Sequence, residues 1–96
     1  MTRRTTLLRM SEDKLEYTGK VYLYSSGMPE DLITLSKEKL MERGVSESDI
    51  VVLLDPVGVP EGSIMATIWP HYLSVARVKR VREGSIYAPQ LFNIQF

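Results

Sequence analysis

The sequence predicts a single α+β domain over residues 1–96, in which one short main helix packs on a largely antiparallel β-sheet. The length of 96 residues fits one domain with one modest core. Several short segments rich in β-branched and aromatic residues are separated by turns that contain Gly and Pro. Residues 37–43 have instead the composition of a helix, which Gly44 would end.

The first strands are expected over residues 5–10 and 20–25. Residues 5–10 (TTLLRM) are a short β-prone run, and residues 15–18 can extend the next strand, with Gly19 as a turn or bulge. Residues 20–25 (KVYLYS) alternate aliphatic residues with Tyr, so both faces of this strand are apolar. We therefore expect it to be buried on both sides, or to have one side covered by a partner chain.

Residues 29–43 allow two interpretations. In the first, a helix begins at Pro29, has two acidic residues in its first turn where they favour the helix dipole, and ends at Gly44. In the second, residues 32–35 (LITL) form a short strand, and only residues 37–43 are helical. Both interpretations predict a helix over residues 37–43.

Three further segments complete the expected sheet in the second half of the chain. Residues 50–54 (IVVLL) are the strongest strand signal, because all five are aliphatic. A Gly- and Pro-containing loop joins them to residues 63–69 (SIMATIW), which is typical of a hairpin with a long tip. Residues 72–83 (YLSVARVKRVRE) can be helix or strand. Their three valines favour strand, and the irregular spacing of those valines then requires a bulge.

The composition excludes several classes of protein. The chain has no cysteine, which rules out a disulfide framework, a thiolate nucleophile and a thiolate metal site. Its longest apolar run, residues 50–54, is far shorter than the roughly 20 residues of a membrane span. We therefore expect a soluble, cytoplasmic protein that does not enter a membrane. The scarcity of heat-labile side chains suits a thermophilic source.

No pattern in the sequence predicts catalysis. His71 is the only histidine and has no neighbouring nucleophile, and residues 55–62 (DPVGVPEG) lack the GK[ST] ending of a phosphate-binding loop. Nucleophile-elbow, zinc-protease and calcium-loop patterns are absent as well. We therefore expect a protein that is not an enzyme, with no catalytic residue, metal or cofactor.

The positive charge of the second half of the chain is concentrated in one short segment. Among residues 51–96 the only Lys and Arg residues are Arg77, Lys79, Arg80 and Arg82. A local cluster of this kind can bind the phosphates of duplex DNA although the net charge of the chain is zero. The alternative is a solvated strand whose edge is protected by its Lys and Arg residues.

Three arginines near the N-terminus, Arg3, Arg4 and Arg9, can join the same nucleic-acid-binding surface. Residues 1–4 are expected to be a flexible basic arm, and an arm of this kind can reach into a DNA groove. The alternative is a frayed terminus that its charge keeps soluble.

Residues 33–54 (ITLSKEKLMERGVSESDIVVLL) resemble the half-motif of AbrB/MazE-type swapped-hairpin DNA-binding regulators. In order, the short strand, the helix start, the Gly-aliphatic stop, the acidic turn and the aliphatic strand of that motif match residues 34–35, 36–38, 44–45, 48–49 and 50–54. Residues 18–21 (TGKV) resemble the opening strand. The resemblance implies an intertwined homodimer that binds duplex DNA through basic residues near that strand, where Arg9, Lys14 and Lys20 are the candidates by position.

The C-terminal segment suggests a second class of function. Phe92, Ile94 and Phe96 alternate with polar residues, which is typical of a half-buried strand. An apolar, aromatic strand can add to the sheet of another protein. The alternative to DNA binding is therefore an assembly or adaptor protein, of a virus or a larger complex, that contacts a protein partner through these three residues.

Overall fold

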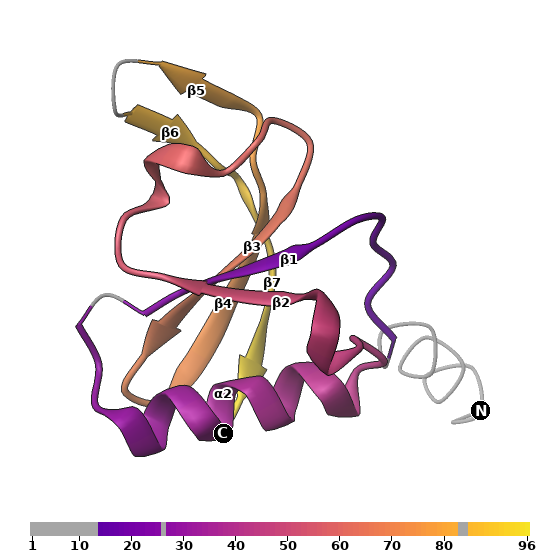
Figure 1. Cartoon of the computed structure of the whole chain (residues 1–96), viewed down its shortest axis with the longest axis vertical. Helices are drawn as coiled ribbons and strands as arrows, with labels where there is room; N and C mark the ends of the chain where they lie inside the picture. Colours follow the sequence, from indigo (N-terminus) through magenta and orange to yellow (C-terminus); the bar gives the residue numbers. More distant parts are fainter. Residues whose placement is uncertain (1–13, 26, 83–84) are drawn as a thin grey trace, which may run out of the picture.

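The computed structural model describes residues 14–25, 27–82 and 85–96 (Figure 1). In chain order its elements are β1 (Val21–Tyr24), α2 (Glu30–Glu42), the 3-10 turn η1 (Glu47–Asp49), β2 (Ile50–Leu53), the 3-10 turn η2 (Pro56–Gly58), β3 (Ile64–Trp69), β4 (Tyr72–Arg77), β5 (Arg80–Arg82), β6 (Ser85–Tyr87) and β7 (Gln90–Gln95). The strand predicted over residues 5–10 and the arm predicted over residues 1–4 lie outside the described residues. The extension predicted over residues 15–18 is not a strand.

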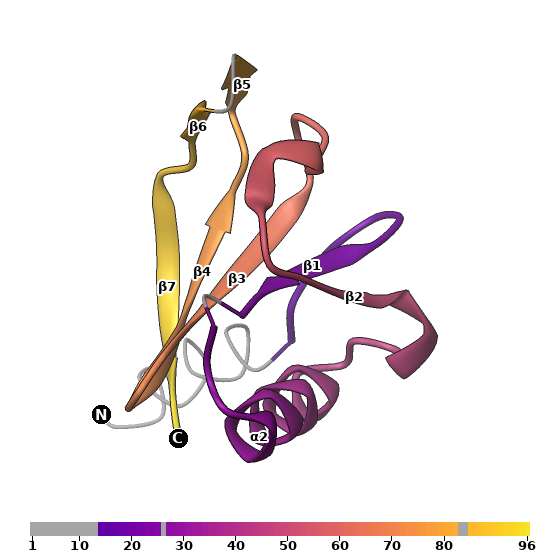
Figure 2. The same cartoon turned by 60° about the vertical axis from the view of Figure 1, so that its left-hand side comes forward.

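Five of the strands form one sheet in the order β2-β1-β3-β4-β7, and β5 and β6 form a separate two-stranded sheet. β1 is parallel to both of its neighbours, whereas the β3–β4, β4–β7 and β5–β6 pairs are antiparallel. Figure 2 shows α2 alongside one face of the sheet, where it contacts β3. The predicted α+β class, with one main helix on a largely antiparallel sheet, is confirmed.

β1 occupies the position between β2 and β3, and the hairpin predicted for those two strands is therefore wrong. Val21 of β1 lies opposite Ile50 of β2 on one side and opposite Ile64 of β3 on the other. The side chains of Val21 and Leu23 are fully buried, and the two tyrosines of β1 are half-buried on the opposite face. A strand that is apolar on both faces gains most from a central position, which explains why β1 separates two strands that follow each other in sequence.

The first interpretation of residues 29–43 is confirmed, with the start shifted by one residue. Pro29 is extended and precedes the first helical residue, Glu30, so that Pro29 is the N-cap. Residues 32–35, which the second interpretation assigned to a strand, are helical because Leu32 and Ile33 pack against the core from the inner face of α2.

Gly44 ends α2 as predicted. Its φ of +94° is a conformation that other residues adopt only with strain. Its N–H donates to the carbonyl of Met41 at 3.0 Å, and the N–H of Val45 returns to the carbonyl of Leu40 at 3.1 Å. These bonds satisfy carbonyl groups that the end of a helix leaves without partners.

The core lies mainly between α2 and one face of the sheet. Its buried members are Leu15, Val21, Leu23, Leu40, Val45, Ile64, Ala66, Ile68, Leu73, Val75 and Ile94. A smaller cluster of Val59, Met65 and Val78 covers part of the opposite face, where the half-buried Tyr22 and Tyr24 pack against it. Burial of β1 is therefore complete on the α2 side and partial on the other.

Residues 72–77 form strand β4, which decides between the helix and the strand expected over residues 72–83. The predicted irregularity is present, but the extra residue belongs to the partner strand. Val75 lies opposite Phe92 and Ala76 lies opposite Gln90, so Leu91 of β7 has no opposite residue.

Within the described residues, no helix has both the length and the apolar content that crossing a membrane requires.

Candidate nucleic-acid interface

The basic segment lies at the tip of a long hairpin that extends past the five-stranded sheet (Figures 1 and 2). Its ascending arm consists of β4 and β5, and its descending arm of β6 and β7. Arg77 ends β4, whereas Arg80 and Arg82 are the first and last residues of β5. We call residues 77–87 the basic hairpin.

Two interruptions separate the basic hairpin from the main sheet. On the first arm, the backbone of Val78 is hydrogen-bonded to the segment before β3. Its N–H donates to the carbonyl of Ser63 at 2.9 Å, and its carbonyl accepts from the N–H of Gly62. On the other arm, Pro89 lacks the N–H that a continuous ladder needs. Pairing resumes where the N–H of Lys79 donates to the carbonyl of Tyr87 at 2.7 Å. The sequence therefore builds a separate ribbon on a firmly anchored base.

The two cations at the base of this hairpin, Arg77 and Lys79, are exposed. The Arg77 guanidinium donates to the carbonyl of Gly62 at 3.3 Å, a contact that orients the side chain without neutralising it. Neither residue forms an ion pair with a described carboxylate. Their charge is therefore available to an anion from solution.

Lys20 is at the same end of the sheet, since Val21 lies opposite Ile64 and Ile64 lies opposite Arg77. Its charge is partly compensated. The Nζ atom lies 3.2 Å from the carbonyl oxygen of Ser48 and 3.9 Å from Oδ1 of Asp49, and half of the side chain remains exposed. Among the basic residues predicted to bind DNA, Lys20 thus has a carboxylate partner, whereas Arg77 and Lys79 have none among the described residues.

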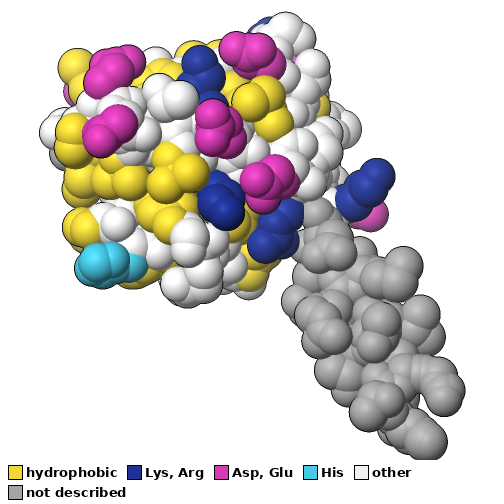
Figure 3. Space-filling view, turned by 90° about the horizontal axis from the view of Figure 1, so that it is seen from below, with side chains coloured by type: hydrophobic (Ala, Val, Ile, Leu, Met, Phe, Trp, Pro, Cys, Tyr) yellow, Lys and Arg dark blue, Asp and Glu magenta, His cyan; other side chains and the backbone are white. Residues whose placement is uncertain are grey.

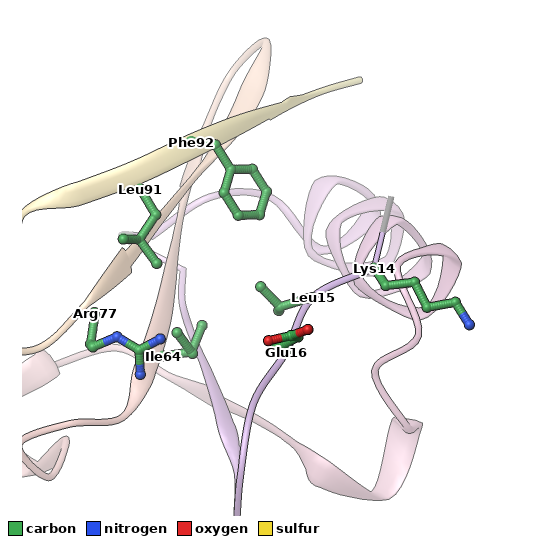
Figure 4. Close-up of a pocket in the computed structure, with 7 residues that line it drawn as sticks. All are labelled: Lys14, Leu15, Glu16, Ile64, Arg77, Leu91 and Phe92. Carbon is green, nitrogen blue, oxygen red and sulfur yellow. The ribbon is translucent and has the colours of Figure 1, made fainter. Parts of the chain in front are cut away.

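A pocket of about 450 Å³ opens beside the base of the basic hairpin (Figure 4). Its lining residues are Lys14, Leu15, Glu16, Ile64, Arg77, Leu91 and Phe92. Figure 4 shows Arg77 on one side of the pocket and the Lys14–Glu16 segment on the other, with the Lys14 side chain directed away from Arg77. Apolar side chains line the rest of the pocket. The sequence gives no signal that Leu91 lines a pocket, because its position follows from the irregularity in β7.

Among the described residues, the opposite end of the molecule has no comparable concentration of positive charge. Seen from below in Figure 3, Lys and Arg side chains are interspersed with Asp and Glu. Lys39 of α2 lies 3.9 Å from Glu42 in an ion pair one helical turn apart. The described residues of this end therefore attract an anion less strongly than the basic hairpin does.

The partner-binding residues predicted in the C-terminal strand face the core of the same chain. Ile94 is 2% exposed, and Phe92 and Phe96 are half-buried against the same cluster. The Ile94 side chain is inaccessible to a partner while the domain is folded and belongs to the core, and partner binding through this strand stays a prediction. The predicted alternation is present, but its apolar face is turned to α2.

The remaining predicted sites are either outside the described residues or isolated. Arg3, Arg4 and Arg9 belong to residues 1–13, which the structure does not describe. His71 is exposed in the turn between β3 and β4, and its backbone carbonyl accepts a hydrogen bond from the N–H of Phe96 at 3.3 Å. In the described part of the chain, no three His, Asp or Glu side chains are grouped to hold a metal ion.

The structure can be compared, segment by segment, with the motif on which the AbrB/MazE resemblance depends. Residues 34–35, the short strand of the motif, lie within α2, whereas the Gly44 stop and the aliphatic strand at residues 50–53 are present. No family model matches the chain, and no curated protein or solved structure matches it either.

Proposed function

We propose that this protein is a cytoplasmic, non-enzymatic DNA-binding protein that regulates transcription and grips duplex DNA with the basic hairpin. One observation carries the proposal: a two-stranded ribbon that contains Lys79, Arg80 and Arg82 projects from the sheet, and Arg77, at the end of β4, lies at its base. A two-stranded β-ribbon fits the major groove of B-DNA, which is about 12 Å wide. The ribbon therefore combines a suitable shape with a suitable charge.

The distribution of charge also favours an approach in which the basic hairpin, and not the rest of the chain, faces DNA. Residues 77–87 contain four Lys and Arg residues and one Glu, a net charge of +3 in a chain whose total is zero. The rest of the chain is consequently acidic by the same amount. DNA attracts the hairpin and repels the remainder, so a neutral protein with this asymmetry approaches DNA tip first.

The pocket beside the hairpin extends the positive surface. Lys14 and Arg77 line it together although 63 positions separate them in sequence, and Glu16 between them limits the local charge. One or two cations here are enough to strengthen binding at the flank of a groove. Each contact with a phosphate group releases counterions and so adds to the binding free energy.

Salt-dependent binding of a fluorescent duplex tests the proposal. Each phosphate contact contributes about −0.9 to the slope of log K against log salt. The double variants R77A/K79A and R80A/R82A should each make this slope shallower by about 1.8. A matched control, K37A/K39A, removes two positive charges from α2 and should leave the slope unchanged.

Two results would contradict the proposal. One is the absence of binding by the wild-type chain at about 50 mM salt, where electrostatic binding is strong. The other is a slope that R77A/K79A and R80A/R82A change no more than the α2 control does. Circular dichroism of each variant verifies that the fold is kept.

A further inference from the structure

The pocket beside the basic hairpin has the size and the lining of a small-molecule site. Its volume of about 450 Å³ lies within the roughly 300–1,000 Å³ that is typical of ligand pockets. The lining residues come from β3, β4, β7 and the segment before β1, and none of them belongs to α2. The pocket therefore opens on a part of the sheet that α2 does not cover.

The apolar residues that line this pocket are Leu15, Ile64, Leu91 and Phe92. Leu15 and Ile64 belong to the buried core, which fixes their positions. Leu91 is 49% exposed and Phe92 is half-buried, and Figure 4 shows both side chains directed from β7 toward Leu15 and Ile64. A ligand with an apolar body would remove this surface from water and would be stabilised by that burial.

Arg77 gives the pocket a cation that no described carboxylate neutralises. A guanidinium has five N–H donors in a planar fork, and one Nη atom of Arg77 donates to the carbonyl of Gly62 at 3.3 Å. This contact orients the fork and leaves donors for two parallel hydrogen bonds to a carboxylate. Lys14 adds no comparable anchor, because its side chain is directed away from Arg77 (Figure 4).

Glu16 disfavours a second charge on the side of the pocket that lies opposite Arg77. Another anion would be repelled there, and an ammonium group would gain little, because Glu16 is exposed to water. A phosphate monoester carries nearly two negative charges, more than the single guanidinium neutralises. The lining therefore matches a ligand with one singly charged anionic group, bound at Arg77.

We propose that this pocket binds a monocarboxylic acid with an apolar body, of the medium-chain fatty acid class. Its carboxylate pairs with Arg77, and its body covers Leu91 and Phe92. This site requires no DNA and goes beyond the proposed function. Arg77 also belongs to the basic hairpin, so a bound acid would occupy a guanidinium that DNA also uses, and this consequence alone rests on the proposed function.

Titration of the isotope-labelled full chain with decanoate, followed by NMR and without DNA, tests the proposal. The amide signals of Ile64, Arg77, Leu91 and Phe92 should shift together and reach saturation. Decan-1-ol and decylamine have the same apolar body with a neutral and a positive head group. Both should bind at least about 10-fold more weakly than decanoate, because neither can accept a charge-assisted bond from Arg77.

Two substitutions separate the charge from the apolar surface. Arg77→Gln should weaken decanoate binding at least about 10-fold and should remove the preference for decanoate over decan-1-ol. Leu91→Asn should weaken both ligands by about 5-fold, because it removes apolar contact without changing the charge. Both replaced side chains are exposed, so the fold should persist. The matched control Lys37→Gln removes a positive charge from α2, outside the pocket, and should leave decanoate binding unchanged.

The comparison of head groups uses the wild-type chain and stays decisive if a variant fails to fold. Absence of shifts at the pocket residues, or equal binding of decanoate and decan-1-ol by the wild-type chain, overturns the proposal. An Arg77→Gln variant that binds decanoate as tightly as the wild type also overturns it. A chain that binds duplex DNA but not decanoate refutes this inference and leaves the proposed function intact.

Discussion

Ser25 has a buried hydroxyl group without a hydrogen-bond partner, and removing this group should stabilise the protein. The residue follows β1 and is 0% exposed, and no described residue offers a partner to its Oγ atom. Its backbone is fully engaged, since the N–H donates to the carbonyl of Leu53 at 3.0 Å and the carbonyl accepts from the N–H of Met28 at 2.9 Å. Burying a hydroxyl without a partner costs about 1–3 kcal/mol.

The expected gain for Ser25→Ala follows from two opposing contributions. The variant keeps both backbone hydrogen bonds and recovers the cost of the unpaired hydroxyl. It also leaves a void of about 15 Å³ at most, which at about 24 cal/mol per Å³ costs roughly 0.4 kcal/mol. The desolvation contribution is larger, so the free energy of unfolding should rise by about 1–2 kcal/mol. For a domain of this size the melting temperature should rise by about 4–8 °C for each kcal/mol.

Thermal and guanidinium unfolding, followed by circular dichroism, measures this change, and Ser36→Ala is the matched control. Ser36 is equally buried, but its hydroxyl donates to the carbonyl of Leu32 at 2.8 Å. Removing it forfeits a bond worth about 1 kcal/mol and improves helix propensity by about 0.5 kcal/mol, so no gain is expected. A Ser25→Ala protein no more stable than the wild type would show that the Ser25 hydroxyl has a partner in solution and would refute the reasoning.

Two further substitutions test the ends of α2 and η1 by the same unfolding assays. Gly44→Ala should cost about 1–2 kcal/mol, because the φ of +94° at the end of α2 strains any residue with a Cβ. Gly58→Ala, where an added Cβ meets no atom within 4 Å, should cost nothing, and equal losses in both variants would contradict this explanation. Tyr17→Phe should cost about 1–2 kcal/mol, because the hydroxyl donates to Asp49 at 2.7 Å and accepts from the N–H of Ser46 at 3.2 Å. An unchanged stability would mean that these bonds do not hold residue 17 to η1 in solution.

The local elements were predictable because their signals lie within a few adjacent residues. Gly44 ends α2 as expected, and the strands at Val21–Tyr24, Ile50–Leu53 and Ile64–Trp69 follow β-branched and aromatic runs. The choice between helix and strand for residues 32–35 was open. Their apolar side chains suit either element, and only packing of α2 against the sheet decided it.

The candidate site was predictable in composition but not in arrangement. The concentration of cations at residues 77–82 is a sequence property, and its place on a projecting ribbon depends on the bonds between Val78 and residues 62–63. The ion pair of Lys20 with Asp49 joins residues far apart in the chain, and so does the pocket that Lys14 and Arg77 line from opposite sides. Neither leaves a local pattern.

The sequence by itself determined the helix before Gly44, the strands at Val21–Tyr24, Ile50–Leu53 and Ile64–Trp69, and where positive charge is concentrated, because propensity, periodicity and charge are properties of neighbouring residues. Only the tertiary structure decided which strands pair and which faces are buried. β1 separated β2 from β3, α2 covered the face that contains Ile94, and β2 was left at an edge of the sheet. These outcomes follow from competition among all strands for the central positions, where burial of apolar surface is greatest, and no single segment contains that information.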